Sequence, residues 1–512
     1  MSSNNFYVTT PIFYVNDVPH IGHAYTSIAC DVVARFMRLD GRDVKYLTGT
    51  DEHGQKVEKS AEKAGILPQD FVNKNSQAFR DMASALNLSH DDFIRTTEDR
   101  HKQAVIAFWK VLEERGDIYL DKYAGWYSVR DEAYYTENEL TEEGLAPTGA
   151  PVEWVEESSY FFALSKWQDK LLEYYENNPN FIQPQSRRNE VISFVKSGLI
   201  DLSISRTSFK WGVPVPGNSE HVVYVWLDAL TNYISALGYP EKTEDFAKFW
   251  PASAHVVGKD ILRFHAVYWP AFLMAANLPL PKSIIAHGWW TNEGEKISKS
   301  LGNVIDPIAL IDEFGLDQVR YFLMREINFG NDGNFSKDNL VTRNNSELAN
   351  KIGNLLQRTS AFVYKNCEQK VPQVNSDYIT EFYSSELMQE IHSIIQDNAA
   401  RMESFQINKV LDNIIHITER ANIYIDHEAP WALRKTDTDK MNQVLYSLLE
   451  MLRYIAIMLQ PFVPNAAQNM LEQLNIPKDQ RNFAQLNQQF ALVSGANINE
   501  PKPVFPRIEV KS

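Results

Sequence analysis

The chain has 512 residues, of which 44% are hydrophobic and 23% charged, and its formal net charge is −16. This length allows roughly two to four domains with cores of ordinary size. The acidic balance argues against indiscriminate binding to nucleic acids, although a local basic stripe can still bind a specific RNA. No apolar run of about 18 residues predicts a membrane span. The two cysteines, Cys30 and Cys367, are too few for a disulfide framework or a thiolate zinc site.

The first fifty residues follow the pattern of a strand, a helix and a second strand. Residues 6–15 are rich in β-branched and aromatic residues and predict a buried strand. Apolar residues recur at helical spacing from Tyr25 to Met37, and Gly41 closes that helix. Residues 44–49 predict the next strand. A unit of this kind predicts a parallel sheet.

The rest of the chain divides into an insertion, a second α/β region and a helical region. Residues 120–150 are rich in Tyr, Glu and Gly and predict a small insertion. Residues 221–330 alternate between strand and helix patterns, with strands expected at 221–227, 254–257 and 283–287. Beyond about residue 335, helical periodicity predicts an all-α domain that extends to about residue 475. A tail rich in Asn, Gln and Pro follows and is expected to be irregular.

The first motif that could bind a substrate or take part in catalysis is Pro19-His20-Ile21-Gly22-His23, between the first strand and the start of the helix. A helix N-terminus offers unpaired N–H groups and the positive end of the dipole to a phosphate. Gly22 lets a nucleotide approach the backbone closely. His20 and His23 can donate hydrogen bonds to a phosphoryl oxygen as charge builds on it. For this motif alone, a helix start with two surface histidines remains an alternative.

The second motif is Lys296-Ile297-Ser298-Lys299-Ser300, between Gly294 and Gly302. Its lysines and serines on a glycine-flanked loop suit a mobile clamp on a pyrophosphate leaving group. Alone, the motif is equally compatible with a solvated charged loop. The order of the two motifs strengthens both, because one lies at the first strand–helix turn and the other follows the last predicted strand of the α/β region.

Together the motifs resemble the HIGH and KMSKS signatures of class I aminoacyl-tRNA synthetases, in which they bind ATP and stabilise adenylation at the α-phosphate. Further segments resemble the methionyl members of that class, and the resemblance runs from about residue 6 to residue 509. These segments are Thr10–Asn16, Gly49–Gly54, Tyr224–Ala229, Gly258–His265 and Ala429–Trp431.

The resemblance implies an α/β fold: a Rossmann-type parallel-sheet catalytic domain with a small inserted connective domain, followed by an all-α helix-bundle anticodon-binding domain. The expected catalytic halves are residues 1–118 and 221–335, and the insertion is 119–220. The helical domain is expected at 336–475, and the tail, 476–512, is expected to pack back.

The resemblance also implies which residues bind each substrate. The ATP site would comprise His20, Gly22, His23, Gly258, Asp260, Lys296, Ser298 and Lys299, with both histidines and both lysines catalytic. The methionine pocket would comprise Ile12, Tyr14, Asp51, Trp226, Ala229, Leu230, Tyr233, Ile261, His265 and Trp269. Asp51 would hold the substrate ammonium and pair with Arg206, and Asp260 would accept the ATP ribose hydroxyls.

Aromatic walls suit a soft thioether, although core packing is the alternative interpretation of Trp226, Tyr233 and Trp269. Leu230 stands where some members of the family carry proline, and its apolar side chain still suits the pocket.

The insertion departs from the family pattern. Many methionyl enzymes carry a Cys-x-x-Cys knuckle, whereas Ser128 and Asp131 occupy the expected cysteine positions here. Residues 145–149 contain no Cys or His that could supply a second pair. A tetrahedral zinc site needs four nitrogen or sulfur ligands. We therefore predict a single zinc-free knuckle, with Mg²⁺ entering only with ATP, and packing supplied by Trp126, Tyr127, Tyr134 and Tyr135.

A polar stripe follows the helix expected around residues 346–364. Asn350, Asn354 and Arg358 step by four beside its apolar face, and such side chains can read exposed base edges. Trp431 could stack on a base. The resemblance assigns these four residues to the CAU anticodon of tRNA(Met). Without it, the stripe is an ordinary solvated helix face.

Four alternatives fit the sequence less well. Valyl, isoleucyl and leucyl enzymes carry a large editing insertion, for which the interval from His20 to Lys296 leaves little room. A cysteinyl enzyme would hold zinc at its amino-acid site. A catalytically inactive tRNA-binding paralogue would not need both intact motifs and Asp51, and a free-standing nucleotidyltransferase would not need the helical domain.

The expected reaction has two steps. The methionine carboxylate attacks the α-phosphate of Mg-ATP in line, and a hydroxyl of the terminal tRNA adenosine then attacks the methionyl-adenylate. No protein general base is evident for the second step, and positioning suffices. The polar start of the chain lacks a signal-peptide layout, which predicts a cytoplasmic enzyme without membrane contact. We expect a monomer, because no dimerisation module follows the helical domain.

Overall fold

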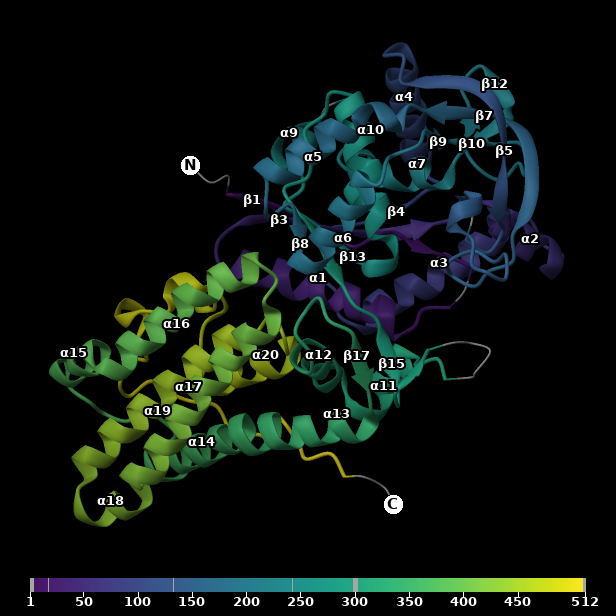
Figure 1. The fold of residues 1–512 in the computed structure, drawn as a ribbon. Coiled ribbons are helices and arrows are strands. Elements are labelled where there is room, and N and C mark those ends of the chain that lie inside the picture. Colours follow the sequence, from purple (N-terminus) through teal and green to yellow (C-terminus); the bar gives the residue numbers. More distant parts are fainter. Residues whose placement is uncertain (1–3, 17, 132, 242, 298–302, 510–512) are drawn as a thin grey trace.

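The computed structural model describes residues 4–16, 18–131, 133–241, 243–297 and 303–509. A parallel sheet lies at the centre of the N-terminal half, in the order β2-β3-β1-β13-β14-β8, with β4 also paired to β3 (Figure 1). Its strands are β1 (Asn5–Thr9), β2 (Phe13–Tyr14), β3 (Asp43–Asp51), β4 (Asp92–Arg95), β8 (Ile182–Gln183), β13 (Ala254–Gly258) and β14 (Ile284–His287).

Helix α1 (Ile21–Leu39) connects β2 to β3 and packs against the sheet. Its residues Ile28, Val32 and Phe36 are buried, as their helical spacing predicts. The predicted strand–helix–strand unit and the parallel sheet are therefore confirmed, but the single strand predicted at residues 6–15 is wrong: it is divided into β1 and β2, which both pair with β3. Further helices of this half are α2 (Gln55–Ala64), α3 (Pro68–Ala85), α4 (Asp99–Glu114), α9 (Glu244–Phe249), α10 (Trp269–Ala275), α11 (Pro307–Phe314) and α12 (Leu316–Arg325).

The strand predicted at residues 221–227 is wrong in its second half. Strand β12 (Asn218–Val223) ends there, and helix α7 (Val225–Leu230) begins. A short apolar run is compatible with a buried strand or a buried helix, so periodicity alone could not decide. The choice depends on tertiary contacts, because the buried carboxylate of Asp228 on α7 bonds to histidines from two distant segments.

The insertion forms an antiparallel sheet in the order β6-β5-β7-β9 at the edge of the N-terminal half farthest from the C-terminal helices (Figure 1). Its long strands are β5 (Ile118–Ser128) and β7 (Glu153–Phe162), and its short ones are β6 (Ala133–Tyr135) and β9 (Leu202–Ser203). Helices α5 (Gln168–Asn177) and α6 (Gln185–Lys196) follow β7. Strand β8 lies within the predicted insertion, residues 119–220, yet pairs with β14 of the catalytic sheet.

The C-terminal half is helical, as predicted. A continuous helical rod is built from α13 (Lys337–Arg343), a π-helical segment (Asn344–Gly353) and α14 (Asn354–Asn366). The remaining helices are α15 (Ser376–Ser384), α16 (Glu386–Glu403), α17 (Ile407–Glu428), α18 (Pro430–Thr436), α19 (Thr438–Leu459) and α20 (Pro464–Gln473). The tail packs back along them: Asn345 donates to the carbonyl of Ile508, and Phe505 is buried.

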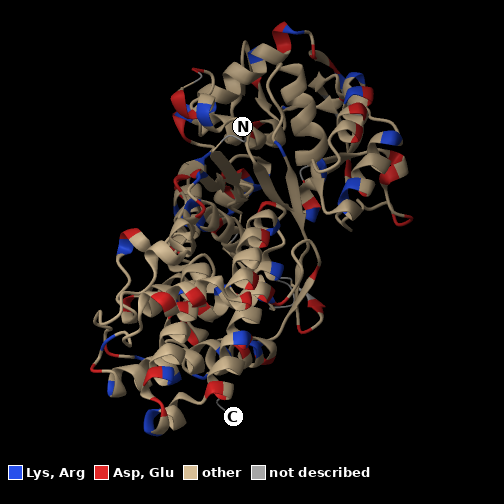
Figure 2. Cartoon of the chain, turned by 90° about the vertical axis from the view of Figure 1, so that its left-hand side faces the viewer, with Lys and Arg blue, Asp and Glu red and all other residues tan. Residues whose placement is uncertain are grey.

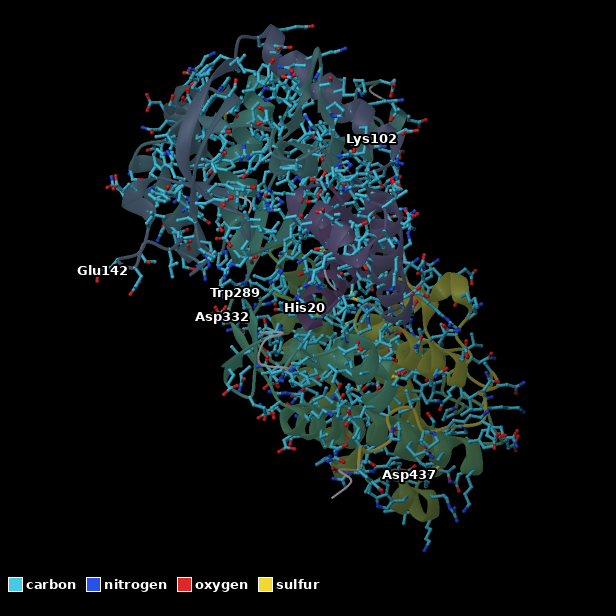
Figure 3. The ribbon with its side chains drawn as sticks, turned by 90° about the vertical axis from the view of Figure 1, so that its right-hand side faces the viewer. His20, Lys102, Glu142, Trp289, Asp332 and Asp437 are labelled. Atoms are coloured by element: carbon cyan, nitrogen blue, oxygen red, sulfur yellow. The ribbon has the colours of Figure 1, made fainter. Side chains whose placement is uncertain are left out.

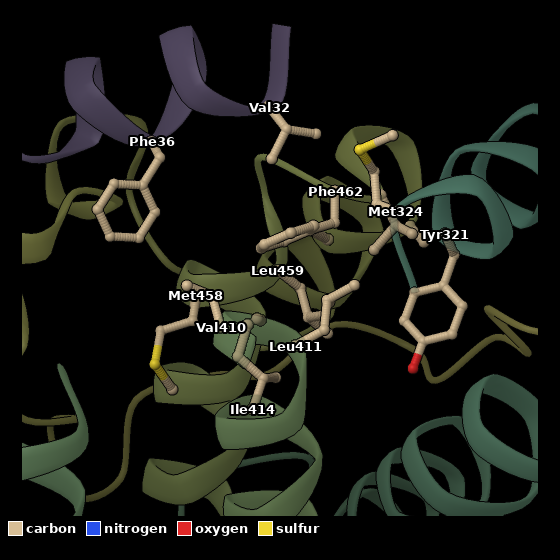
Figure 4. Close-up of a cluster of buried hydrophobic side chains, with 14 of the residues drawn as sticks. Val32, Phe36, Tyr321, Met324, Val410, Leu411, Ile414, Met458, Leu459 and Phe462 are labelled. Carbon is tan, nitrogen blue, oxygen red and sulfur yellow. The ribbon is translucent and has the colours of Figure 1, made fainter. Parts of the chain in front are cut away.

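One hydrophobic core joins the two halves. Figure 4 shows side chains of α1 and α12 facing those of the C-terminal helices α17 and α19 and of the segment after α19, namely Val32, Phe36, Tyr321, Met324, Val410, Leu411, Ile414, Met458, Leu459 and Phe462. The fully buried Arg320 lies at the same junction. It pairs with Asp31 of α1 at 2.7 Å and donates to three backbone carbonyls, those of Leu86, Pro461 and Phe462.

Candidate active site

A cavity of about 710 Å³ opens at the carboxyl ends of the parallel strands. In an open α/β sheet this edge is where ligands bind. The predicted residues that line it are Ile12, Tyr14, His20, Gly22, His23, Asp51, Trp226, Ala229, Leu230, Tyr233, Gly258, Asp260, Ile261 and His265. The fold therefore brings together side chains that are separated by about half of the sequence.

The first motif forms the N-terminus of α1. His20 is the N-cap, and its Nδ1 accepts the backbone N–H of Gly22 at 3.1 Å. The Nδ1 of His23 in turn accepts the backbone N–H of His20 at 3.1 Å. The two rings lie with their centroids 3.9 Å apart. A Cβ on Gly22 would lie 2.9 Å from the His20 ring, so glycine lets the ring cover the helix end.

These bonds fix the tautomers of both histidines. Since each Nδ1 accepts a backbone N–H, the proton of the neutral ring resides on Nε2. Burial, reinforced by His20, holds the pKa of His23 well below its usual range, so His23 stays neutral. Two Nε2–H donors therefore lie at the positive end of a helix dipole, an arrangement that suits an anionic phosphate.

Asp260 lies just after β13. Gly258 has no room for a side chain, because a Cβ would lie 2.5 Å from Asp260 Oδ1. The same oxygen accepts the indole N–H of Trp289 at 3.0 Å. The carboxylate is thus held at the cavity wall by its neighbours.

Aromatic rings form the other end of the cavity. Trp226 stacks on Phe264 with ring centroids 3.8 Å apart. His265 Nδ1 lies 2.9 Å from the carbonyl of Ile261 and must donate to it, so its Nε2 accepts the Tyr233 hydroxyl at 2.7 Å. Burial lowers the pKa of His265 to about 4, which keeps the ring neutral. An apolar wall with one fixed polar group fits a thioether side chain.

Asp228 was not predicted as a site residue. Its Oδ2 lies 2.6 Å from His53 Nδ1 and its Oδ1 lies 2.8 Å from His101 Nε2. Burial alone would raise the pKa of Asp228, but the two histidines outweigh it and hold the pKa at about 2. The bonds tie α7, which carries Trp226 and other pocket residues, to the segment that follows Asp51 and to α4.

Two residues predicted from the family pattern lie outside the cavity lining. Trp269 is fully buried behind Tyr233, with ring centroids 6.1 Å apart. Arg206 lies on β10 (Ser205–Arg206), where it donates to the carbonyl of Ser205 at 2.7 Å and stacks on Tyr134. A contact of Trp269 with methionine and an ion pair between Arg206 and Asp51 both remain predictions.

The second motif follows a hairpin at the cavity mouth. Strands β15 (Trp290–Asn292) and β16 (Glu295–Lys296) pair through a turn in which Gly294 has a φ of 85°. Ile297 and Val304, which flank the loop, line the cavity. Lys296 lies on β16, whereas Ser298 and Lys299 are outside the described residues.

The predicted anticodon residues lie in the C-terminal half, far from the cavity. Asn350 and Asn354 are exposed on one helical rod. The Arg358 guanidinium lies 5.2 Å from the centroid of the half-exposed Trp431 ring and bonds to Asp426 at 2.6 Å. The fold therefore brings Arg358 and Trp431, from α14 and α18, into one surface cluster. Figure 2 shows acidic and basic residues intermixed over both halves.

Several cavity residues had no signal in the sequence. Val18, Lys56, Arg130 and Trp289 line the cavity without belonging to a motif used above, and Asp131 lines it although it was considered only as a position of the knuckle. They come from separate segments, and only the fold brings them together. Within the described ranges, no group of three or more His, Cys, Asp or Glu side chains is arranged to hold a metal ion.

Comparison with known proteins identifies the family. A family model described as tRNA synthetases class I (M) matches residues 6–148 and 138–360, and one described as the anticodon binding domain of methionyl tRNA ligase matches residues 376–512. The chain belongs to the methionyl-tRNA synthetases. The family is a group of class I aminoacyl-tRNA synthetases, so the predicted class is confirmed.

Relatives and solved structures of this family cover nearly the whole chain. Methionine–tRNA ligase of Rickettsia felis is 66% identical over 506 residues, 99% of each chain, and that of Brucella suis is 54% identical over 511 residues, 99% of this chain and 98% of the relative. Mycobacterium tuberculosis methionyl-tRNA synthetase in complex with methionyl-adenylate superposes with a TM-score of 0.94 at 47% identity, over 98% of this chain and 100% of that one. Its apo form gives a TM-score of 0.88 at 44% identity, over 99% of each.

Proposed function

We propose that this chain is a methionine–tRNA ligase that activates methionine with ATP and transfers it to the 3′-terminal adenosine of tRNA(Met), for both initiation and elongation. The observation that carries the proposal is the cavity itself. One end holds two histidine donors at a helix N-terminus, and the other holds an aromatic wall around a neutral histidine. An ATP phosphate fits the first end and a methionine side chain the second.

In the first step, the carboxylate of methionine attacks the α-phosphate and releases pyrophosphate. His20 and His23 donate from Nε2 to the phosphoryl oxygens as negative charge accumulates. Lys296, Ser298 and Lys299 bind the pyrophosphate. Mg²⁺ enters as part of Mg-ATP and neutralises phosphate charge.

The same cavity orients the two substrates. Asp51 holds the ammonium group of methionine, and Asp260 accepts the ribose hydroxyls beside Gly258. Ile12, Tyr14, Trp226, Ala229, Leu230, Tyr233, Ile261 and His265 surround the side chain of the substrate, and Trp269 supports this wall from behind Tyr233. In the second step, the terminal adenosine of tRNA attacks the carbonyl of the adenylate, with positioning as the contribution of the protein.

The deciding experiment is ATP–pyrophosphate exchange with each of the twenty amino acids. We expect exchange with methionine at a kcat/KM at least about 100-fold above that for any other amino acid, because the buried His265–Tyr233 pair fits a thioether. His23→Ala should abolish most of this exchange while leaving methionine binding measurable by calorimetry. Exchange with another amino acid and not with methionine would refute the proposal.

We further propose that Asn350, Asn354, Arg358 and Trp431 read the anticodon. The support is the surface cluster of Arg358 and Trp431, in which a ring and a guanidinium can both stack on unpaired bases. Asn350, Asn354 and Trp431 are exposed, so packing of the core does not explain them.

Replacement of Trp431 tests this separately from catalysis. Trp431→Ala should lower kcat/KM for aminoacylation of tRNA(Met) by roughly tenfold or more, the value of one base-stacking contact. ATP–pyrophosphate exchange should stay unchanged, because it needs no tRNA. Trp154→Ala, which removes another exposed tryptophan, serves as the matched control. Equal losses in both assays would contradict the assignment.

We also propose that the knuckle holds no zinc. Hydrogen bonds link the two positions at which cysteines were expected: the backbone N–H of Asp131 donates to Ser128 Oγ at 3.2 Å. Asp131 also accepts from the Tyr135 hydroxyl at 3.1 Å and from Thr148. The Arg206 guanidinium stacks on Tyr134, whose ring packs against Tyr127. These contacts can supply the order that a metal gives elsewhere.

Metal analysis of the purified protein tests this proposal. We expect well under about 0.1 zinc per chain, and full exchange activity after treatment with a chelator followed by removal of the chelator and addition of Mg²⁺, because four suitable ligands are needed for a structural site. Zinc at one equivalent per chain, or activity restored only by zinc, would contradict it.

We propose a monomer as the active form. No helix among the described residues is long and apolar enough to cross a membrane. We place the enzyme in the cytoplasm, with tRNA(Met), methionine and ATP as its partners. Sedimentation of the protein with and without tRNA tests the monomeric state, and a dimer at micromolar concentration would contradict it.

A further inference from the structure

Trp289 is a large aromatic residue that is 43% exposed at the cavity wall, although nothing in the two motifs predicts a role for it. It directly precedes β15, the strand that leads to the second motif. Its indole Nε1–H donates to Asp260 Oδ1 at 3.0 Å. This is a charge-assisted bond to the carboxylate that we propose for the ATP ribose, and such bonds are the stronger ones.

A lysine ammonium contacts the face of the Trp289 ring. Lys259 Nζ lies 4.4 Å from the ring centroid, and the same ammonium bonds both carboxylate oxygens of Asp332 at 2.7 Å. Asp332 Oδ1 also accepts the backbone N–H of Trp289 at 2.8 Å. Figure 3 shows Trp289 and Asp332 next to each other, near His20. A cation over the face of tryptophan is an attractive contact that also limits ring rotation.

The backbone explains why Asp332 can reach this position. A Cβ on Gly288 would lie 2.3 Å from the carbonyl oxygen of Asn331 and 2.5 Å from the nitrogen of Asp332. The two segments therefore touch at Gly288, and the backbone N–H of Gly333 donates to the carbonyl of Trp289 at 2.8 Å. Asp332, Lys259, Trp289 and Asp260 form a chain of contacts from the base of the hairpin to the cavity.

From this arrangement we infer that Trp289 is a positioning residue for nucleotide recognition. It fixes Asp260 through Oδ1, so that Oδ2 is the oxygen presented to a ribose hydroxyl, and the Lys259–Asp332 pair braces the ring. The inference rests on the proposed role of Asp260 and deepens it. It also makes the ribose contact depend on the segment that anchors the second motif.

The test compares ATP with 2′-deoxy-ATP and 3′-deoxy-ATP in methionine-dependent pyrophosphate exchange. Trp289→Phe keeps a ring for Lys259 but removes the N–H. It should lower the ratio of kcat/KM for ATP over that for at least one deoxynucleotide by roughly fivefold or more, as expected when one bond to a charged group is lost. The KM for methionine should change less than about twofold. A general disturbance of the fold would change this KM as well. Lys259→Met should shift the same ratio in the same direction by a smaller factor.

Asp260→Asn, measured in parallel, distinguishes the ribose role of Asp260 from the positioning role of Trp289. If it lowers the ratio while Trp289→Phe does not, the ribose role of Asp260 stands and the positioning inference is overturned. If Asp260→Asn leaves the ratio unchanged, both the ribose role and the inference fail. Should Trp289→Phe not fold, Lys259→Met decides: a lowered ratio supports the inference, and an unchanged ratio overturns it.

Discussion

In or behind the cavity lie three buried histidines, His255, His265 and His287, and the half-buried His23, each with a ring nitrogen engaged by a neighbour. Burial lowers the pKa of His23, His255 and His287, and lowers that of His265 to about 4. Each is therefore neutral in the folded protein at a pH at which it would be partly charged in the unfolded chain. Neutrality is what allows His23 and His265 to act as hydrogen-bonding partners of fixed tautomer.

A pH dependence of stability follows. Below the unfolded pKa of about 6.5, these histidines bind protons in the unfolded chain but not in the folded protein. The free energy of unfolding is therefore full above pH 6.5 and falls as the pH drops toward about 4. For His265 alone the loss amounts to about 3 kcal/mol over that window. Denaturant unfolding at pH 7.5, 6.5, 5.5 and 4.5 measures it.

The control for this prediction is His265→Gln, which cannot titrate in this range. Its stability should be lower at pH 7.5, because the bond with Tyr233 is altered, but should fall less steeply with acid. A free energy of unfolding that rises between pH 6.5 and 5.5 in the parent protein would contradict the argument.

At the scale of single residues, the sequence was informative where a motif named the residue. His20, His23 and Asp260 could be predicted, and all three line the cavity. Asp228 could not, because its two histidine partners come from elsewhere in the chain and no local pattern marks the contact. Trp289 was also missed, since its contacts with Asp260 and Lys259 exist only in three dimensions.

Among the elements, the start of α1 forms the end of the cavity that we propose for the ATP phosphates. The His20 ring covers the helix end only because residue 22 has no side chain. Gly22→Ala should therefore move the ring and lower kcat for pyrophosphate exchange by roughly tenfold or more, since a misplaced donor loses much of its transition-state stabilisation. Stability should change by less than about 1 kcal/mol, because alanine favours a helix. Exchange kinetics and thermal unfolding measure the two effects.

The matched control is Gln69→Ala, at the corresponding second position of α3. It should leave exchange unchanged, because that helix end lies outside the cavity lining. An active Gly22→Ala enzyme with parental kcat would show that the position of the His20 ring is not limiting.

Elements in which apolar residues repeat over several turns or alternations could be predicted from the sequence, whereas short elements could not. Helix α1 and strand β3 have the expected bounds to within a few residues, because their apolar residues repeat over several turns or alternations. The segment 221–227 changes from β12 to α7 in the middle of an apolar run. There the deciding interactions are non-local, chiefly those of Asp228.

For the whole molecule, the junction between the halves depends on Arg320. Its guanidinium has no exposure to solvent and bonds to Asp31 and to backbone carbonyls of both halves. Burial alone would raise the pKa of Asp31, but Arg320 and Arg35 outweigh it and keep the carboxylate charged. Arg320→Met should destabilise the protein by about 3–5 kcal/mol, because it leaves a buried charge and several carbonyls without their donor.

Denaturant unfolding measures this loss, with Arg38→Met as the control. Arg38 is also an arginine of this region and pairs with Asp91, but it is partly exposed, so its replacement should cost at most about 1 kcal/mol. Similar effects of the two substitutions would show that the buried pair does not hold the junction.

The helical rod from α13 to α14 has a consequence of another kind. It begins two residues after β17 (Gly333–Phe335), which pairs with β15 beside the cavity, and it carries the stripe Asn350, Asn354 and Arg358. The number of residues between the start of α13 and Asn350 sets both the distance of the stripe from the cavity and the direction in which it faces. Substitutions that keep the helix intact leave this direction unchanged, whereas inserting or deleting one residue in the α-helical segment α13 would rotate the stripe by about 100° about the helix axis. Relatives of this chain should therefore hold the length of this rod constant.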